Sequence, residues 1–411
     1  MPMPERGRPW PELAAEMEAM RADDLDWRSG RHGAYVWYAS DELEHVLREA
    51  FGMFLVENGL GIRVFPSLAR MESEVLETVA DLLGGPGAPG IFTSGGTESI
   101  FLAVAAMREW ARATRPGLQR PGVVAPHSAH PALDKAAHYL GLEVRRVPVG
   151  PDFRADPAAM ATAIDGQTLG LYASAPSYAL GMVDPIAELG RLAAARGLWL
   201  HVDACVGGIL GPFVRELGFP VPPFAFEAGG VTSVSADLHK SGFAAKPAST
   251  VLFRTEAHRE FARFTFSDWP GGTYSSLTFT GTRPGGAIAA AWAAFQFLGR
   301  EGYRELAAAS MRARAAIDSG LRAIDGVRIH GEPQLFAFAW AAEGVSMGRV
   351  AAALAREGWV AARTTSPDGI HVMATPIHER YADEYVAAAA RAVAAARAAA
   401  GPAPERPAAY N

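Results

Sequence analysis

Short apolar segments alternate with longer amphipathic segments through residues 67–236, and this alternation constrains the fold more than any other feature. The helical segments, such as residues 97–113, place apolar residues at three- and four-residue spacing. Parallel strands need helical crossovers, so we predict an α/β fold with a mostly parallel sheet between helices. The predicted strands lie at residues 90–93, 122–126, 142–149, 168–175, 199–205 and 230–236.

The pattern changes along the chain and divides it into regions. Residues 1–60 predict an N-terminal helical arm, with Ser40 as the cap of its second helix. Residues 61–280 carry the alternating pattern and predict the large domain. Residues 281–400 combine alanine-rich helices with a few strands, which predicts a smaller α+β C-terminal domain. Residues 401–411 predict a flexible tail.

Composition excludes several classes of protein. The net charge of −6 gives no basic footprint, so we expect no nucleic-acid partner. The single cysteine, Cys205, excludes an intramolecular disulfide and fits a reducing compartment. No apolar stretch resembles a signal peptide or a membrane span. We therefore expect a cytoplasmic protein without a membrane anchor.

A glycine turn opens one of the predicted helices. Residues 93–99 read TSGGTES, where backbone N–H groups and the helix dipole form a site suited to a phosphate. The alternative is an ordinary structural turn, which is common in α/β proteins.

Three further polar residues follow predicted strands. Asp203 ends a buried strand, so its carboxylate should meet a cation, either a protonated pyridine nitrogen or a structural arginine. His130 is either a structural histidine held by hydrogen bonds or a ring that stacks on a flat aromatic ligand. Lys240 is either a surface lysine or an amine whose lowered pKa makes it a nucleophile.

Taken together, these features match one ligand. Ligands of parallel sheets bind at the carboxyl ends of the strands, where all four features should converge. A phosphate site, an imidazole for a ring face, a carboxylate for a ring nitrogen and an amine for an aldehyde are what pyridoxal phosphate (PLP) requires. We therefore predict PLP as the cofactor, and no metal site.

Longer motifs carry a family resemblance from about Phe65 to Leu335. The chain resembles the sphingosine-1-phosphate lyases and their bacterial relatives, within the group II PLP-dependent decarboxylases of fold type I. This resemblance implies the PLP-dependent transferase fold with a seven-stranded sheet, and makes residues 61–280 the PLP-binding domain. It rests on FPSLARMESEV, FTSGGTESI, VAPHSAHPALDKAAHYLG, HVDACVGG, GVTSVSADLHKSGFAAK, DWPGGTY and GTRPGG.

The resemblance also implies residue roles. Lys240 would bind the cofactor aldehyde, Asp203 the ring nitrogen and His130 the ring face. Lys246 would act near the substrate as a second lysine, and Tyr178 would belong to the active-site loop. Family members form homodimers with the active site at the interface, so three residues would contact the neighbouring subunit's cofactor phosphate: Thr282, Gly285 and Gly286. The other implied cofactor contacts are Gly96, Thr97, Ser235 and His239, the last also a candidate catalytic residue.

The substrate side departs from the family pattern. Residues 58–66 read NGLGIRVFP where the lyases usually have NPLHPDVFP, so Gly61 replaces a histidine and Arg63 an aspartate. Arg63 either binds an anionic head group or forms a structural ion pair. Candidate substrate contacts are Asn58, Arg63, Tyr35 and Trp37.

These observations predict a PLP-dependent carbon–carbon lyase. It would cleave a phosphorylated amino alcohol, such as a sphingoid base phosphate, by retro-aldol chemistry to an aldehyde and an amine. The alternative is an amino-acid decarboxylase, which uses the same electron sink on a different substrate. A non-catalytic PLP-binding protein is a third possibility, disfavoured because Lys240, Asp203 and His130 are all present.

Overall fold

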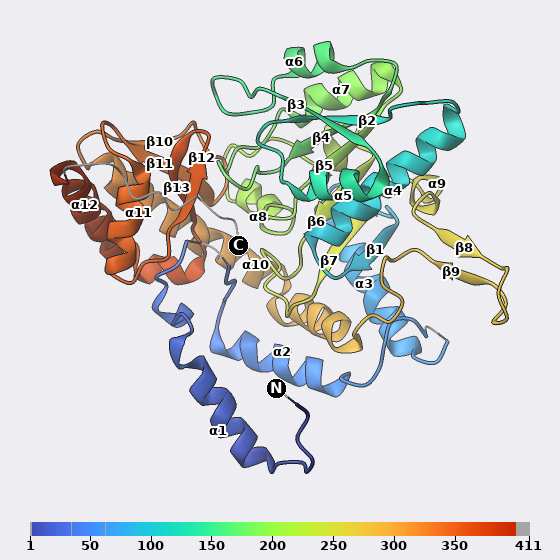
Figure 1. Cartoon of the computed structure of the whole chain (residues 1–411), viewed down its shortest axis with the longest axis horizontal. Coiled ribbons are helices and arrows are strands. Elements are labelled where there is room, and N and C mark those ends of the chain that lie inside the picture. Colours follow the sequence, from blue (N-terminus) through green and yellow to red (C-terminus); the bar gives the residue numbers. More distant parts are fainter. Residues whose placement is uncertain (1, 34, 62, 400–411) are drawn as a thin grey trace.

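The computed structural model describes residues 2–33, 35–61 and 63–399. Residue 400 and the predicted tail at 401–411 lie outside this range. Figure 1 shows a large sheet flanked by helices, a smaller sheet beside it, and the N-terminal helices along one side. None of the described helices has the length and apolar character needed to cross a bilayer.

The central sheet has seven strands in the order β1-β7-β6-β5-β4-β2-β3. Every pair from β6 to β3 is parallel, and β7 alone runs antiparallel to its two neighbours. The predicted fold class is confirmed. Strand β7 was not predicted, because it returns from β6 without a crossover helix. The strands are β1 (Gly90–Thr93), β2 (Gly122–Pro126), β3 (Glu143–Val147), β4 (Thr168–Ser174), β5 (Trp199–Asp203), β6 (Ser233–Ala236) and β7 (Ser249–Phe253).

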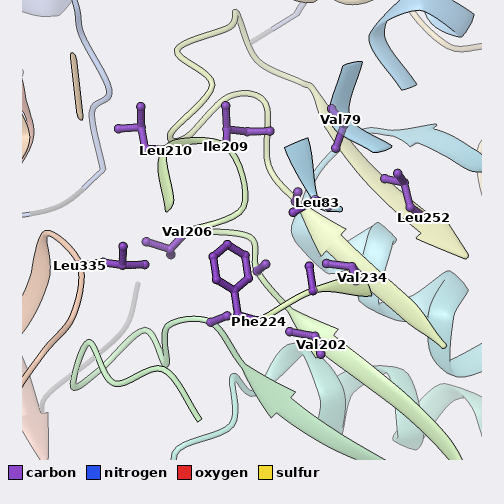
Figure 2. Packing of buried hydrophobic residues seen from close by; sticks show 14 of the residues in the cluster. Val79, Leu83, Val202, Val206, Ile209, Leu210, Phe224, Val234, Leu252 and Leu335 are labelled. Carbon is purple, nitrogen blue, oxygen red and sulfur yellow. The ribbon is translucent and has the colours of Figure 1, made fainter. Parts of the chain in front are cut away.

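Side chains alternate between the two faces of this sheet, and both faces are buried. In β2, Val123 and Ala125 pack with helices α4 (Gly96–Thr114) and α5 (Ala132–Leu140). Val124, between them, packs on the opposite face. That second core continues through the apolar side chains of Figure 2. Burial on both faces explains why the strands read as continuous apolar segments.

Apart from the helices of the N-terminal arm, the further helices of this region pack around the sheet. Ser40 caps α2 as predicted, since its Oγ accepts a hydrogen bond from the Leu43 amide at 3.1 Å. The strands β8 (Phe264–Phe266) and β9 (Tyr274–Ser276) form a hairpin that projects from the body (Figure 1). The helices are α1 (Trp10–Met20), α2 (Asp41–Met53), α3 (Pro66–Leu82), α6 (Pro157–Ala163), α7 (Ile186–Arg196), α8 (Leu210–Glu216) and α9 (Glu256–Glu260).

The C-terminal region forms its own core around an antiparallel sheet of order β10-β11-β13-β12. Helix α10 (Gly285–Arg322) leads into it and is interrupted at Gly299, where φ is 55°. The remaining elements are β10 (Val327–Ile329), β11 (Ala337–Ala342), α11 (Met347–Arg356), β12 (Ala362–Thr365), β13 (Asp368–Met373) and α12 (Ala382–Ala398).

One glycine allows the loop after β4 to pack against β11. Gly181 has φ of 76°, and an added Cβ would lie 1.9 Å from the Ala337 carbonyl oxygen. We expect Gly181→Ala to lower the free energy of unfolding by about 2–5 kcal/mol, through backbone strain plus overpacking. Gly197→Ala, at φ of 60° with open space around it, should cost only about 1–2 kcal/mol. Chemical denaturation measures both, and equal losses would contradict this account.

Candidate active site

A cavity of about 370 Å³ lies at the carboxyl ends of the central strands. Its wall is formed by the segments that follow β1, β2, β4, β5 and β6. The structure therefore brings together residues that are distant in sequence, as expected for a parallel sheet. The predicted site residues in this wall are Gly96, Thr97, His130, Tyr178, Asp203, His239 and Lys240.

Lys240 enters this cavity and forms an ion pair with a buried acid. Its Nζ lies 3.0 Å from Oδ2 of Asp237, a carboxylate that is 1% exposed. Burial disfavours the ammonium, but the negative charge of Asp237 outweighs it and raises the pKa of Lys240 well above its usual value. The sequence-based expectation of a lowered pKa is therefore wrong for this arrangement of side chains.

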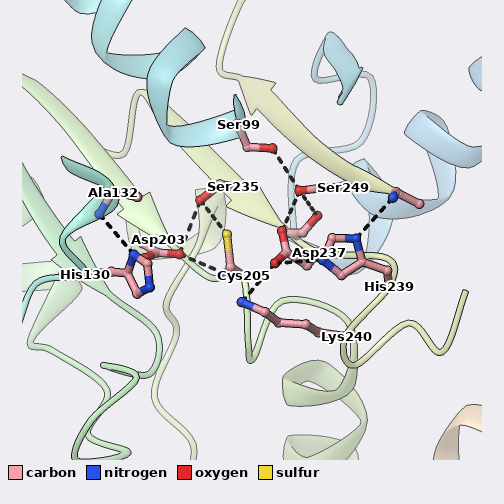
Figure 3. Close-up of polar contacts among 12 residues, drawn as sticks. Ser99, His130, Ala132, Asp203, Cys205, Ser235, Asp237, His239, Lys240 and Ser249 are labelled. Carbon is pink, nitrogen blue, oxygen red and sulfur yellow. Dashed lines mark hydrogen bonds and ion pairs between the residues drawn. The ribbon is translucent and has the colours of Figure 1, made fainter. Parts of the chain in front are cut away.

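A chain of hydroxyl groups holds Asp237 in place (Figure 3). Ser249 donates to Oδ1 of Asp237 at 2.5 Å, and the Ser99 hydroxyl lies 2.8 Å from that of Ser249. Thr93 continues the chain at 2.6 Å from Ser99. The network joins β1, α4 and β7 to the segment after β6, so the position of Lys240 depends on the packing of the whole sheet.

Asp203 is the second buried acid of the cavity, with 7% of its surface exposed. It accepts hydrogen bonds from the Tyr172 hydroxyl at 2.6 Å and the Cys205 amide at 3.1 Å, and the Ser235 hydroxyl lies 3.4 Å away. Burial opposes its charge, but His130 and these donors outweigh burial and lower its pKa. Within the described parts of the chain, no ion pair neutralises it.

Two neutral histidines border the cavity. Burial lowers the pKa of His130, whose Nδ1 accepts a hydrogen bond from the Ala132 amide at 3.1 Å. Burial likewise lowers the pKa of His239, whose Nδ1 accepts from the Ala248 amide at 3.1 Å. Both rings are therefore oriented by the backbone and uncharged near neutral pH.

The N-terminus of α4 forms the opposite part of the wall. Glu98 accepts hydrogen bonds from the amides of Ser94 at 2.7 Å and Phe279 at 3.1 Å, which closes the turn. A Cβ at Gly96 would lie 2.7 Å from Sγ of Cys205. The turn therefore requires glycine, and its first amides point to a site where an anion is favoured.

A second cavity of about 710 Å³ adjoins the first and shares His130 and Tyr178 with it. Tyr35, one of the predicted substrate contacts, lines this cavity. Tyr178 packs between the two, with ring centroids 6.1 Å from His130 and 4.6 Å from His371.

The structure places the other predicted site residues elsewhere. Lys246 and Trp37 line a third cavity of about 500 Å³, where Trp37 packs against Phe243 and Phe336. Ser235 lies behind Asp203. Asn58 pairs with Pro284 next to an exposed Arg63. The remaining three lie in or beside the start of α10, outside the cofactor cavity of the same chain: Thr282, Gly285 and Gly286.

Several functional side chains were not predicted. Asp237 lies three residues before Lys240, and this short spacing was a usable signal. Tyr172 gave no signal, because it looks like an ordinary strand residue. Arg146 and His371 meet the site only in the folded structure. Arg146 hydrogen-bonds the His130 loop, and His371 packs against Tyr178, so neither contact could be recognised from a local motif.

Arg146 in β3 fixes the loop that carries His130. Its guanidinium donates to the carbonyl groups of His127 at 2.8 Å and Ala129 at 3.1 Å, and pairs with Asp134 at the start of α5. The loop therefore has two of its backbone carbonyl groups satisfied by one half-buried side chain. Arg146 is a positioning residue for His130.

Comparison with known proteins agrees with this geometry. Residues 3–338 match the pyridoxal-dependent decarboxylase conserved domain. The sphingosine-1-phosphate lyase of Oryza sativa is 38% identical over 384 residues, covering 91% of this chain and 71% of that protein. The sphingosine-1-phosphate lyase structure from Burkholderia pseudomallei has a TM-score of 0.93 and 37% identity, covering 97% of this chain and 93% of that one. Glutamate decarboxylase from Lactobacillus brevis, with a TM-score of 0.84 and 18% identity over 98% and 96% of the two chains, shares the fold.

The chain therefore belongs to the pyridoxal-dependent decarboxylase family. Within that family it is a PLP-dependent lyase of the group that contains the sphingosine-1-phosphate lyases and their bacterial relatives.

The residues of the first cavity fit PLP. Asp203 is a buried carboxylate without an ion pair in the described structure, which suits a protonated ring nitrogen. The α4 N-terminus offers backbone amides to a phosphate, and its Gly96 admits no side chain, because a Cβ would collide with Cys205 and Asp237. Lys240 supplies the amine and His130 a neutral, oriented ring. These four groups lie in one wall.

Arg146→Met tests the role assigned to Arg146. We expect the PLP affinity to fall about tenfold, which corresponds to about 1.4 kcal/mol. The reason is that the His130 loop loses the hydrogen bonds that Arg146 donates to its carbonyl groups. Arg145→Met is the matched control, since Arg145 lies in the same strand but contacts Asp165 and the Ala163 carbonyl group instead. Fluorescence titration of the apoenzyme with PLP measures both. An equal loss of PLP affinity in the two variants would show that Arg146 stabilises the fold and does not specifically position His130.

Proposed function

We propose that this enzyme cleaves a phosphorylated amino alcohol, such as a sphingoid base phosphate, between Cα and Cβ to give an aldehyde and a phosphorylated amine. The observation that carries the proposal is the match to the bacterial sphingosine-1-phosphate lyase, at 37% identity over 97% of this chain. The lyase from Oryza sativa supports it. PLP, when bound, supplies the electron sink that stabilises the carbanion left at Cα.

The residues of this chain have separate tasks in that reaction. Asp203, ionised and hydrogen-bonded to Tyr172, keeps a proton on the cofactor ring nitrogen. Lys240 binds the cofactor and, with Asp237 beside it, holds a proton at Nζ that can pass to Cα. Tyr178 borders both cavities, so its hydroxyl is our candidate for the hydrogen bond that orients the β-hydroxyl group of the substrate.

We also propose that two chains form a homodimer in the cytoplasm. Five large apolar side chains are exposed in the segment before α3, which is unusual for a monomer surface. The same segment abuts GTRPGG through the Asn58–Pro284 bridge. A partner covering it would explain why Thr282, which is exposed, lies outside the cavity of its own chain. The exposed residues are Met53, Leu55, Val56, Leu60 and Val64.

A product assay tests the reaction. Holoenzyme incubated with a phosphorylated sphingoid base should release a long-chain aldehyde and phosphoethanolamine, both detectable by mass spectrometry. Lys240→Ala should reduce turnover at least about 1,000-fold, because it removes the cofactor anchor and the proton carrier together.

The same assay distinguishes the alternative. Amino-acid decarboxylation would release carbon dioxide and leave the phosphorylated amino alcohol unchanged. Carbon dioxide from an amino-acid panel, without aldehyde from the phosphorylated substrate, would overturn the proposed reaction. A PLP-bound protein with neither product would make it a binding protein.

A further inference from the structure

The second cavity is lined by segments that are far apart in sequence, among them residues 127–131 and 146–149 of the large domain. Tyr35 comes from the N-terminal arm, Tyr178 from the loop after β4, and Arg363 and His371 from the C-terminal sheet. Tyr35 has φ of 79°, a strained conformation for an aromatic residue. Such strain persists where the surrounding structure enforces it and is concentrated at functional sites.

The two cavities differ in charge. The first has three acids in its wall: Glu98, Asp203 and Asp237. The second has two arginines, Arg146 and Arg363, and no acid among its described lining residues. An anionic part of a substrate is therefore favoured beside the arginines of the second cavity.

The two arginines of the second cavity are not equivalent. Arg146 is committed to the carbonyl groups of the His130 loop. Arg363 in β12 pairs through Nη2 with Oδ1 of Asp368 at 2.9 Å, and Asp368 is 45% exposed at its side chain. Arg363 also lines the second cavity, with 21% of its side-chain surface exposed, so its guanidinium can meet a ligand from the position it occupies.

His371 also indicates a polar ligand. It is 1% exposed, and neither ring nitrogen has a hydrogen-bond partner of normal geometry among the described residues. Burial lowers its pKa to about 4, an effect that the Ala179 backbone partly offsets, so the ring is neutral and can donate one hydrogen bond. Buried polar atoms without partners are rare and require an explanation.

We propose that the second cavity binds the anionic head group of the substrate, with Arg363 as its ionic contact. The inference rests on the proposed function and extends it, because it assigns a site for the phosphate. It also offers a substitute for the family histidine that Gly61 replaces in the NGLGIRVFP segment. Arg63, the candidate raised by the sequence, is exposed and lines neither cavity of its own chain.

Steady-state kinetics of the holoenzyme test this assignment. Arg363→Ala should raise KM for a phosphorylated sphingoid base about 10- to 100-fold, the effect of losing a charge-assisted hydrogen bond. The value of kcat should change by less than about threefold, because the lost interaction stabilises the bound substrate and the transition state equally. Arg363→Lys should recover part of the loss. Arg356→Ala, an exposed arginine in α11, is the control and should match wild type.

Calorimetric titration of the same holoenzymes with inorganic phosphate separates this inference from the proposed function. In the holoenzyme the phosphate group of PLP occupies the anion site at the N-terminus of α4, so added inorganic phosphate must bind elsewhere. Binding to wild type and Arg356→Ala, but not to Arg363→Ala, would support the site even if no phosphorylated substrate were cleaved.

Three outcomes would overturn the assignment. The first is an Arg363→Ala enzyme that behaves like Arg356→Ala in both measurements. The second is an increase in KM with Arg63→Ala instead, which would transfer the role to Arg63. The third is a change in preference for alkyl chain length without loss of phosphate binding, which would make the cavity a compartment for the tail.

Discussion

The ion pair between Lys240 and the buried carboxylate of Asp237 is the interaction on which the site depends. A carboxylate that is 1% exposed is costly unless a cation and hydrogen-bond donors meet it, and here Lys240 and Ser249 do so. Ser99 and Thr93 extend the network to α4 and β1. The amine, the helix N-terminus and the sheet are thus held in one geometry. Because β7 supplies Ser249, the one antiparallel strand is part of the chemistry as well as the fold.

The two adjoining cavities account for the uneven family resemblance along the chain. The cofactor cavity is built from strand ends of the central sheet, where the long shared motifs lie. The second cavity shares the His130 loop with it, but part of its wall comes from Tyr35 in the N-terminal arm and from residues 362–371 of the C-terminal sheet, which lie outside the shared motifs. Tyr178 lies between them and packs against His371. A single scaffold can therefore keep its electron sink while its substrate contacts change.

Much of this structure was predictable because its signals are local. Six strands, the large and small sheets and the residues around Asp203 and Lys240 follow from periodicity and from the rule that strand ends converge. Strand β7 was missed, because a short return without a helix has no βαβ signature. The pKa of Lys240 was predicted in the wrong direction, since the sign depends on a 3.0 Å contact that spacing alone does not define. Arg146 and His371 act through contacts between segments that are distant in sequence. Such contacts leave no pattern in either segment, so they could not be predicted.

The central claim is that Lys240, within this network, is the residue that binds PLP. The chain contains three lysines, Lys135, Lys240 and Lys246, so the claim can be tested without mutation. Holoenzyme reduced with borohydride and digested should carry a phosphopyridoxyl group on the peptide that contains Lys240, in near-stoichiometric amount. A group on Lys246 or Lys135, or no retained group, would contradict the account.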